Sequence, residues 1–376
     1  METKTFLNMP TILNLLIMAL LLLVILPGSM DIFRLNLVGK YLCYAFAALG
    51  LVLCWGYCGI MSLGQGIFFG LGGYAMAMFL KLEASTPEFT STQNTPGIPD
   101  FMDWNSLTEL PIFWEPFKYL PSTLVLMIAV PSLVAFVIAY AMFKRRVSGV
   151  YFSIITLAIA SIITILFVGQ QGYTGGINGI TDLKTFLGYD IRTDDAKYLL
   201  YFICVILLLT VILLSKFLLA SKFGKLLVAI RDQEERVRFS GYDVANFKIA
   251  VFVLAAAISS LGGALFALQV NFVSPSLIDI ASSIELLIFC AVGGRLSIFG
   301  AVYGTLLVNF AKTNISEAFP ELWTILIGAL FILVVMSFPE GLAGIYNKYL
   351  KKLFTKLISN SQHAAYSEKT HEGAIK

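Results

Sequence analysis

The sequence has few of the residues that enzymes use for chemistry. Charged side chains make up 13% of the 376 residues, against about 25% in soluble domains. The only two histidines, His363 and His371, lie in a polar stretch near the C-terminus. There is no G-x-x-x-x-G-K-[ST] phosphate-binding loop, and no base is available to a serine within the apolar runs. We therefore expect no catalytic residue and no cofactor, and we expect any ATP hydrolysis to occur on a separate chain.

Cysteine is also sparse, and its placement excludes two further kinds of site. The five cysteines, Cys43, Cys54, Cys58, Cys204 and Cys290, all lie in apolar runs. Their odd number and scattered spacing give no disulfide framework. Cys54 and Cys58 have the spacing of two metal ligands on a helix, but no third or fourth ligand is near them in the sequence. The sequence thus predicts buried thiols and no metal site.

Apolar runs, in contrast, are abundant. Hydrophobic residues make up 58% of the chain, and the mean hydropathy is +0.84. A membrane-spanning helix needs about 20 mostly apolar residues, and such runs repeat from one end of the chain to the other. The sequence therefore predicts an all-α integral membrane protein, a polytopic bundle of about ten membrane elements. Clear spans are predicted at Thr11–Pro27, Val38–Tyr57, Ile60–Phe79, Leu120–Phe143, Gly149–Val168, Tyr198–Ala220, Ile249–Val270 and Trp323–Phe338.

The apolar stretch Ile284–Ala311 is too long for one straight span, and Gly293-Gly294-Arg295 interrupts it. We predict two shorter elements, Ile284–Gly293 and Ser297–Ala311, that meet at a polar break. Such a break at membrane depth is tolerated where protein or a water-filled cavity covers it. The split also makes the number of membrane elements even, so that both termini lie on the same side.

Basic residues predict the orientation, because Lys and Arg gather on the cytoplasmic side. Lys144-Arg145-Arg146 and the lysines after Tyr346 predict cytoplasmic segments, whereas the acidic loops at 81–119 and 170–197 are predicted to be external. No A-x-A site follows the first apolar run, so we expect it to remain as a span. The predicted organisation is a cytoplasmic N-terminus at 1–10, a transmembrane domain at 11–346, and a basic and then disordered cytoplasmic tail at 347–376.

One long polar segment lies between two of the predicted spans, at Ser221–Lys248, with the sequence SKFGKLLVAIRDQEERVRFSGYDVANFK. It predicts a charged amphipathic helix on the cytoplasmic side, which Gly241 ends. A turn between spans needs only a few residues. The polar segment (221–248) is therefore predicted to contact a soluble partner. The candidate contact residues are Ala229, Arg231, Asp232, Glu234, Arg238 and Gly241.

A stretch crowded with small residues, Ser62–Tyr74, falls in the third predicted span. Helix packing alone is one interpretation, and the other is a solute pathway lined by Gln65 and Tyr74. At about 100° per residue these two side chains point to opposite sides of a straight helix, about 180° apart. Both face one pathway only if Gly70–Gly73 bends the helix. A similar patch at Ser259–Ala264 is a weak indication of an internal repeat.

Three more residues are candidates for the pathway. Asn178 lies in the glycine-rich stretch Tyr173–Thr181, which is either an ordinary loop or a channel mouth that exposes backbone amides. Glu285 and Arg295 are the ionisable residues nearest to the predicted membrane interior, where charge is costly and often functional. In the competing interpretations, Glu285 caps the outer end of its helix and Arg295 follows the bias of basic residues to the cytoplasmic side.

Several stretches of the chain carry a family resemblance. They are AIRDQEERVRFSGYDVANFK in the polar segment, MSLGQGIFFGLGGYAMAM, GVYFSIITLAIA and AVGGRLSIFGAVYGTLL. These stretches resemble permeases of ATP-binding-cassette importers of the branched-chain amino acid type, over Asp31–Tyr346. Further stretches, among them DIFRLNLVGKYLCYAFAALGL, ELPIFWEPF and LLVNFAKTNISEAFPELWTILIGALFILVVMSFPEGLAGI, resemble the urea branch of that family, in particular the permease usually encoded as the second of two.

The resemblance implies a fold like that of type II ABC importer permeases and a place in the bacterial inner membrane. It implies that the chain forms a pathway for urea together with a second related permease. The other implied partners are two ATPase subunits and an extracellular solute-binding protein. Ala229 and Gly241 match an alanine and a glycine of the family's coupling segment. Arg231-Asp232 departs from the acidic position of other importers, so the details of the ATPase contact do not carry over.

Other functions remain as alternatives. The first is a permease of the same family that imports branched-chain amino acids or related amides. The second is a passive urea channel, which would need no long charged segment between spans. A secondary transporter is a third, but that class usually carries several intramembrane carboxylates or histidines, and Glu285 is the main candidate here.

Overall fold

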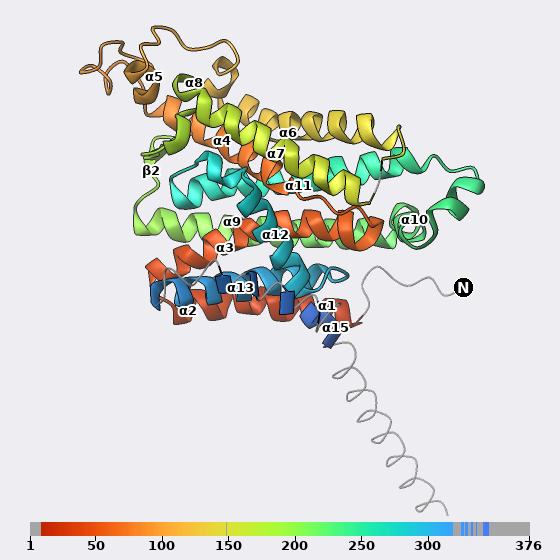
Figure 1. Ribbon diagram of the computed structural model, residues 1–376. Helices are drawn as coiled ribbons and strands as arrows, with labels where there is room; N and C mark the ends of the chain where they lie inside the picture. The colour runs from red at the N-terminus through yellow and green to blue at the C-terminus, as the bar shows by residue number, and fades with distance from the viewer. Residues whose placement is uncertain are drawn as a thin grey trace, which may run out of the picture.

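The computed structural model describes residues 9–147, 149–318 and 341–345, together with a few separate positions between 325 and 336. Six helices in this part of the chain are long and apolar enough to cross a membrane. They occupy Thr11–Ser29, Ile32–Tyr57, Leu120–Phe143, Val150–Gly169, Asp194–Ala220 and Val244–Val270. The helices gather in one bundle (Figure 1). The prediction of an all-α protein with several membrane spans is confirmed.

The first two of these helices each contain a π-helical stretch. α1 (Met9–Leu20) continues through the π-helix η1 (Leu21–Ile25) into α2 (Leu26–Ser29). α3 (Ile32–Leu51) continues into the π-helix η2 (Val52–Tyr57). Single π-helical turns are rare and often lie at functional sites. The comparison applies to η2 because Arg231 in the polar segment donates a hydrogen bond to it.

The core of the bundle consists of α3, α4 (Gln65–Glu83) and α11 (Val244–Val270). In the most apolar stretches of the long helices that contain α3 and α11, 83% and 72% of the residues are buried. The corresponding share is 11–33% in the other four long helices. Those others include α6 (Leu120–Phe143), α7 (Val150–Gly169) and α9 (Asp194–Ala220). Their exposed side chains are largely apolar, for example Leu133, Ile165 and Leu214. Such faces need lipid or another subunit against them.

Short elements close one end of the bundle, which we call the hairpin end. They are α5 (Asp100–Trp104), the 3₁₀-helix η3 (Glu115–Lys118), α8 (Gln171–Thr174), the 3₁₀-helix η4 (Gly176–Asn178), β1 (Thr185–Phe186) and β2 (Tyr189–Asp190). The two strands are antiparallel, with Thr185 opposite Asp190. The other end carries α10 (Lys222–Phe239), and we call it the α10 end. In Figure 1, α5 and β2 lie at the left and α10 at the right.

The stretch predicted to split does so. After the 3₁₀-helix η5 (Pro275–Leu277), α12 (Ile280–Gly293) and α13 (Ile298–Ala318) follow, and the two helices are bent by 118° at the break between them. The predicted break at Gly293–Arg295 is confirmed, and both helices are longer than predicted. A short helix, α15 (Gly341–Ile345), packs against this pair.

The predicted number of ten membrane elements is not established by the described residues. They contain six long apolar helices, or up to seven if the bent pair counts as one span. The predicted span Trp323–Phe338 lies outside the continuously described residues, as does the tail at 347–376. The predicted span Ile60–Phe79 corresponds to α4, which begins only at Gln65.

The polar segment is not one helix, and this corrects the prediction. α10 is broken at Gln233, whose φ and ψ are −151° and 68°. The helix ends at Phe239, and Gly241 follows with φ +87°, a conformation that favours glycine. The Asp243 side chain then accepts a hydrogen bond from the Ala245 amide and begins α11. Residues 244–248 thus form the first turns of the next span, because Gly241 and the capping side chain of Asp243 divide the segment locally.

Candidate functional site

Arg231 attaches α10 to the end of the core helix α3. Its Nη1 donates to the Gly56 carbonyl oxygen in η2 at 2.8 Å, and its Nε donates to Asp232 at 2.8 Å. The hydrogen bond from Arg231 lowers the pKa of the Asp232 carboxyl below its usual value. Arg231 was predicted to contact a partner. In the structure one of its two bonds is directed inward, to η2, and the other holds Asp232, which is the exposed member of the pair.

Glu234 attaches the second half of α10 to α11. Its carboxylate accepts from Lys248 at 2.6 Å and from Arg238 at 2.9 Å. Lys248 is 8% exposed at its side chain and lies over the Phe143 ring at 5.8 Å. Since an unpaired buried ammonium is costly, Lys248 holds Glu234 in place. The sequence indicated the acidic residue but not Lys248, which stands in the apolar helix 14 residues later.

A third contact joins α6 to the turn between α10 and α11. Lys144 donates to Asp243 at 2.7 Å, and this bond lowers the pKa of the Asp243 carboxyl. A cavity of about 320 Å³ lies at this corner, between the ends of α6, α10 and α11. Side-chain bonds thus join α10 to η2 and to α11, and the turn that follows α10 is bonded to the end of α6.

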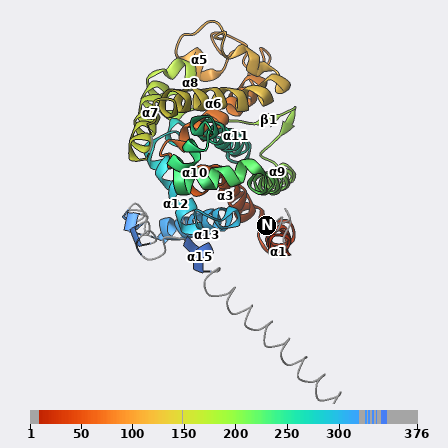
Figure 2. The same cartoon turned by 90° about the vertical axis from the view of Figure 1, so that its right-hand side faces the viewer.

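The opposite face of α10 is exposed in the described part of the chain. Ile230 is buried and Ala229 is half-buried against the bundle, whereas Asp232 and Arg236 are exposed. Phe239, at the end of the helix, is 87% exposed. Figure 2 shows α10 lying across the near end of the bundle. A charged surface with one exposed aromatic side chain has the composition of a protein contact.

Gln65 is fully buried between α4 and α11. Its Nε2 donates to the Ala255 carbonyl oxygen at 3.1 Å and to Ser259 Oγ at 2.6 Å, and its Oε1 has no partner among the described residues. The two helices approach closely here. A Cβ added at Gly72 would lie 2.1 Å from the Ser260 carbonyl oxygen. The two small-residue patches therefore pack against each other, which supports the packing interpretation of both.

Tyr74 lies nine residues after Gln65 on the same helix. α4 is continuously helical from Gln65 to Glu83, and on a straight helix the two side chains point to opposite sides. Tyr74 packs edge-to-face on Phe167 at 4.8 Å, and its hydroxyl has no partner among the described residues. That both residues face one pathway stays a prediction, and of the two we keep Gln65 as the candidate.

Asn178 lies in η4 at the hairpin end, where its side chain is exposed. The loop around it is held by two hydrogen bonds between Ile180 and Val273, at 2.8 and 3.1 Å. Asn178 is far along the chain from Gln65 and lies at the opposite end of α4. The structure therefore does not bring the amide candidates together into one site.

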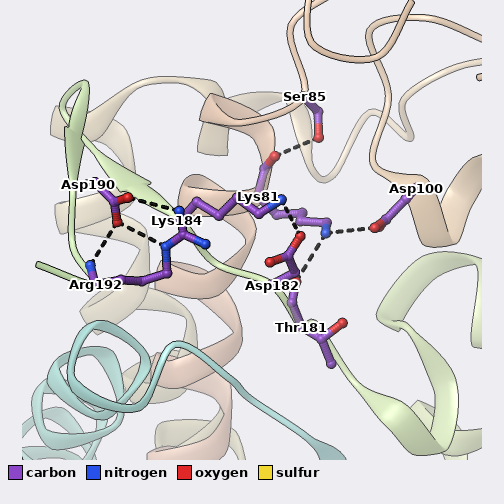
Figure 3. Close-up of polar contacts among 8 residues, drawn as sticks. All are labelled: Lys81, Ser85, Asp100, Thr181, Asp182, Lys184, Asp190 and Arg192. Carbon is purple, nitrogen blue, oxygen red and sulfur yellow. Dashed lines mark hydrogen bonds and ion pairs between the residues drawn. The ribbon is translucent and has the colours of Figure 1, made fainter. Parts of the chain in front are cut away.

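Lys81 organises the hairpin end and was not predicted. It is 5% exposed, and its Nζ donates to Asp100 at 2.9 Å and to the Thr181 carbonyl oxygen at 3.1 Å (Figure 3). Nearby, Glu83 accepts from the amides of Leu187 and Gly188 in the hairpin. The sequence indicated this residue through its position, because it is a lysine at the end of an apolar run. Its bonds join α4 to both loops that were predicted to be external.

Glu285 and Arg295 have different surroundings. Glu285 accepts from Lys312 Nζ at 2.7 and 2.8 Å, so it is part of an ion pair between α12 and α13 and does not cap a helix. Arg295 is exposed at the α10 end and lies over the Trp55 ring at 5.5 Å. This position fits the interpretation in which Arg295 follows the bias of basic residues to one membrane side.

The fold and these contacts define a class of protein. Several apolar helices enclose a buried core, and a charged helix between two of them is bonded to η2 and α11. This is an arrangement of a multi-pass membrane protein with a charged helix at one end. Residues 33–335 match the family model described as the permease component of branched-chain amino acid transport systems. The chain belongs to this family, and it is a transport subunit rather than an enzyme.

Relatives extend this match over most of the chain. The high-affinity branched-chain amino acid transport system permease protein LivM of Salmonella typhimurium is 24% identical over 86% of this chain and 72% of its own. LivM of Escherichia coli is 25% identical with the same coverage. The probable branched-chain amino acid transport permease LivM of Methanocaldococcus jannaschii is 24% identical over 80% of this chain and 90% of its own. No solved structure matches the chain significantly.

Proposed function

We propose that this chain is the permease subunit of an ATP-driven importer in a bacterial inner membrane. A second permease, two ATPase subunits and an extracellular solute-binding protein complete the importer. The observation that carries the proposal is the attachment of α10 to η2 and α11, and of the turn after α10 to α6, within a chain of the branched-chain amino acid permease family. The α10 end faces the cytoplasm, and the hairpin end receives the binding protein.

The substrate class that the relatives favour is branched-chain amino acids. The LivM proteins of three organisms are named for the transport of these solutes, and they align with most of this chain. Urea is the second candidate. It is favoured by the stretches of the sequence that resemble the urea branch, including ELPIFWEPF and LLVNFAKTNISEAFPELW.

In the proposed mechanism the permease alternates between outward-open and inward-open states. Closure of the ATPase subunits displaces α10. The Arg231–Gly56 hydrogen bond transmits this displacement to α3, the Glu234–Lys248 ion pair to α11, and the Lys144–Asp243 ion pair to α6. Because α3 and α11 form much of the buried core, their movement changes access to the interior.

The test measures uptake by proteoliposomes that contain the whole complex, with the binding protein outside and ATP inside. Labelled leucine and labelled urea are compared in parallel. ATP-dependent uptake of leucine supports the first substrate class, and ATP-dependent uptake of urea alone supports the second. Uptake that is equally fast without ATP would overturn the importer proposal in favour of a passive channel.

A further inference from the structure

An apolar groove runs along the outside of the bundle, between α6 and α11. It has a volume of about 650 Å³, and six of its eight lining residues are apolar. Phe136 and Tyr140 form its α6 wall, where their rings stack at 5.7 Å and the residues are 45% and 52% exposed. From Asn246 to Ala257 the groove follows α11 for about 16 Å, at about 1.5 Å per residue. That length is close to the hydrocarbon depth of one bilayer leaflet, about 15 Å.

The groove ends beside a polar cavity. This cavity, of about 320 Å³, lies at the corner between α6, α10 and α11 where Lys144 and Asp243 form an ion pair. Asn246 of the groove follows Ala245 of the cavity along α11, and on α6 Tyr140 lies about one helical turn before Lys144. The two spaces together therefore have an apolar part and a charged part, as a lipid has.

Cations outnumber carboxylates around the polar cavity. Four basic residues line it against two acidic ones, Glu234 and Asp243, and three of the four cations bind these two carboxylates. The fourth cation, Arg146, is exposed and has no acceptor among the described residues. The same is true of Arg145, and the exposed Asn246 side chain makes no hydrogen bond within the described part of the chain. Two guanidinium groups and one amide are thus available to an anion.

Arg146 also occupies a backbone position where glycine is usual. Its amide donates to the Phe143 carbonyl oxygen at 3.1 Å. The Val147 amide donates to the Met142 carbonyl oxygen at 3.0 Å, and the two bonds form the Schellman motif that ends α6. The left-handed residue of that motif is usually glycine, but here it is Arg146, with φ +60°. Since such a conformation is uncommon for other residues and often lies at a functional site, it is a second indication that the Arg146 side chain has a role.

We propose that the groove and the polar cavity together bind one anionic phospholipid of the cytoplasmic leaflet. Its acyl chain lies in the groove, and its phosphate accepts hydrogen bonds from Arg145, Arg146 and the Asn246 amide. Basic pockets between membrane helices on the cytoplasmic side bind anionic headgroups, and the arginine side chain matches the geometry of phosphate. The site goes beyond the proposed transport function. Because it adjoins the Lys144–Asp243 pair, the bound lipid stabilises the corner where α6 meets α10 and α11.

The experiment measures the lipid that stays bound to the whole purified complex in detergent. Phosphatidylglycerol is compared with phosphatidylcholine of the same acyl chains, and the retained lipid is counted by native mass spectrometry, with and without inorganic phosphate. Phosphatidylglycerol should be retained under conditions that remove phosphatidylcholine, and inorganic phosphate should not displace it. Basic residues beside an anionic headgroup add to the attraction one by one. Replacing both arginines, by Arg145→Gln and Arg146→Gln, should therefore weaken retention of phosphatidylglycerol about thirtyfold.

Two further variants test the groove and the specificity of the charge. Ala250→Phe places a ring in the groove, and because Ala250 is exposed, the core is unchanged. It should lower the retention of phosphatidylglycerol, since the ring takes the place of the acyl chain. The matched control removes two charges at the start of α10, by Lys222→Gln and Lys225→Gln. Both lysines are exposed and line neither the groove nor the cavity, so retention should stay within about threefold of the wild type.

Four outcomes would overturn the inference. Equal retention of the two lipids would show that the groove holds lipid without selecting the headgroup. Displacement of phosphatidylglycerol by inorganic phosphate would show that the basic residues hold a free anion. Wild-type retention by the double arginine variant would show that Arg145 and Arg146 do not contact the headgroup. Loss of the second permease from the Ala250→Phe complex would show that a helix of that subunit occupies the groove. None of these measurements requires transport, so a failure of the proposed function is distinguished from a failure of the lipid site.

Discussion

Replacement of Glu234 by Gln should uncouple ATP hydrolysis from uptake. The ion pair with Lys248 joins α10 to α11, and Lys248 is almost fully buried. Removing one member of a buried pair costs about 3–5 kcal/mol. The Glu234 side chain is 31% exposed, so water weakens the pair, and we expect a loss of about 1–3 kcal/mol in the free energy of unfolding.

A double-mutant cycle measures this interaction directly. Glu234→Gln, Lys248→Met and the double variant are compared by thermal unfolding of the purified complex. The double variant should recover most of the stability that Glu234→Gln loses, because it leaves no unpaired buried ammonium. A coupling energy below about 0.3 kcal/mol would refute the claim that the pair joins α10 to α11.

The functional assay is the number of solute molecules imported per ATP hydrolysed in proteoliposomes. Glu234→Gln should lower this ratio while ATP hydrolysis continues. The matched control is Glu235→Gln, because Glu235 is 69% exposed and pairs with Arg238 on its own helix. Its loss should cost at most about 1 kcal/mol and leave the ratio unchanged. An unchanged ratio in Glu234→Gln would refute the transmission role.

Four further outcomes are expected. Gly241→Val should reduce uptake while ATP hydrolysis is retained, because a β-branched residue is strained at φ +87°. Gly241→Asn should have a milder effect, because Asn adopts positive φ more readily. Equal uptake by both variants and the wild type would show that Gly241 has no role in the coupling. Gln65→Leu should reduce uptake but not assembly, since it replaces a buried amide by a similar apolar volume, and unchanged uptake kinetics would end its pathway role. A cysteine at Ser316, in a protein without native cysteines, should react with an impermeant reagent only from outside; labelling only from the cytoplasm would contradict the proposed topology. Asp243→Asn should lower the melting temperature slightly and by a constant amount from pH 8 to pH 5, because the bond from Lys144 lowers the Asp243 pKa. That difference should shrink as the pH falls below about 4, the usual Asp value, and a difference that shrinks already near pH 6 would contradict it.

The membrane fold could be predicted from local properties of the sequence. Hydropathy over about 20 residues is enough to locate a span. The predicted span Leu120–Phe143 coincides with an observed helix, and the predicted span Ile249–Val270 lies within the observed helix Val244–Val270. The break near Gly294 was predictable for the same reason, since a cluster of glycines and an arginine interrupts an apolar run. Gly241 was correctly expected to end the polar helix, because its effect depends on backbone conformation alone.

The sequence was less informative about which polar groups face each other. It indicated Glu234 and Glu285 as charged residues in unusual places, but their partners Lys248 and Lys312 stand 14 and 27 residues further along. It also left open whether Gln65 and Tyr74 share a pathway, which depends on the course of α4 through its glycines. A glycine cluster allows either a bend or close packing, and the neighbouring helix decides between them.

The sequence by itself determined the part of the architecture that depends on whether a stretch of chain prefers the membrane or water. Apolar runs enter the membrane and charged stretches remain outside it. Gly241 and the capping side chain of Asp243 mark the helix ends beside them in the sequence. Only the tertiary structure decided the contacts across the bundle, such as Arg231 on Gly56 and Gln65 on Ser259, which are 175 and 194 residues apart. These contacts depend on how closely α3, α4 and α11 approach. That approach is set by the fit of small residues on facing helices, which no single stretch of sequence contains.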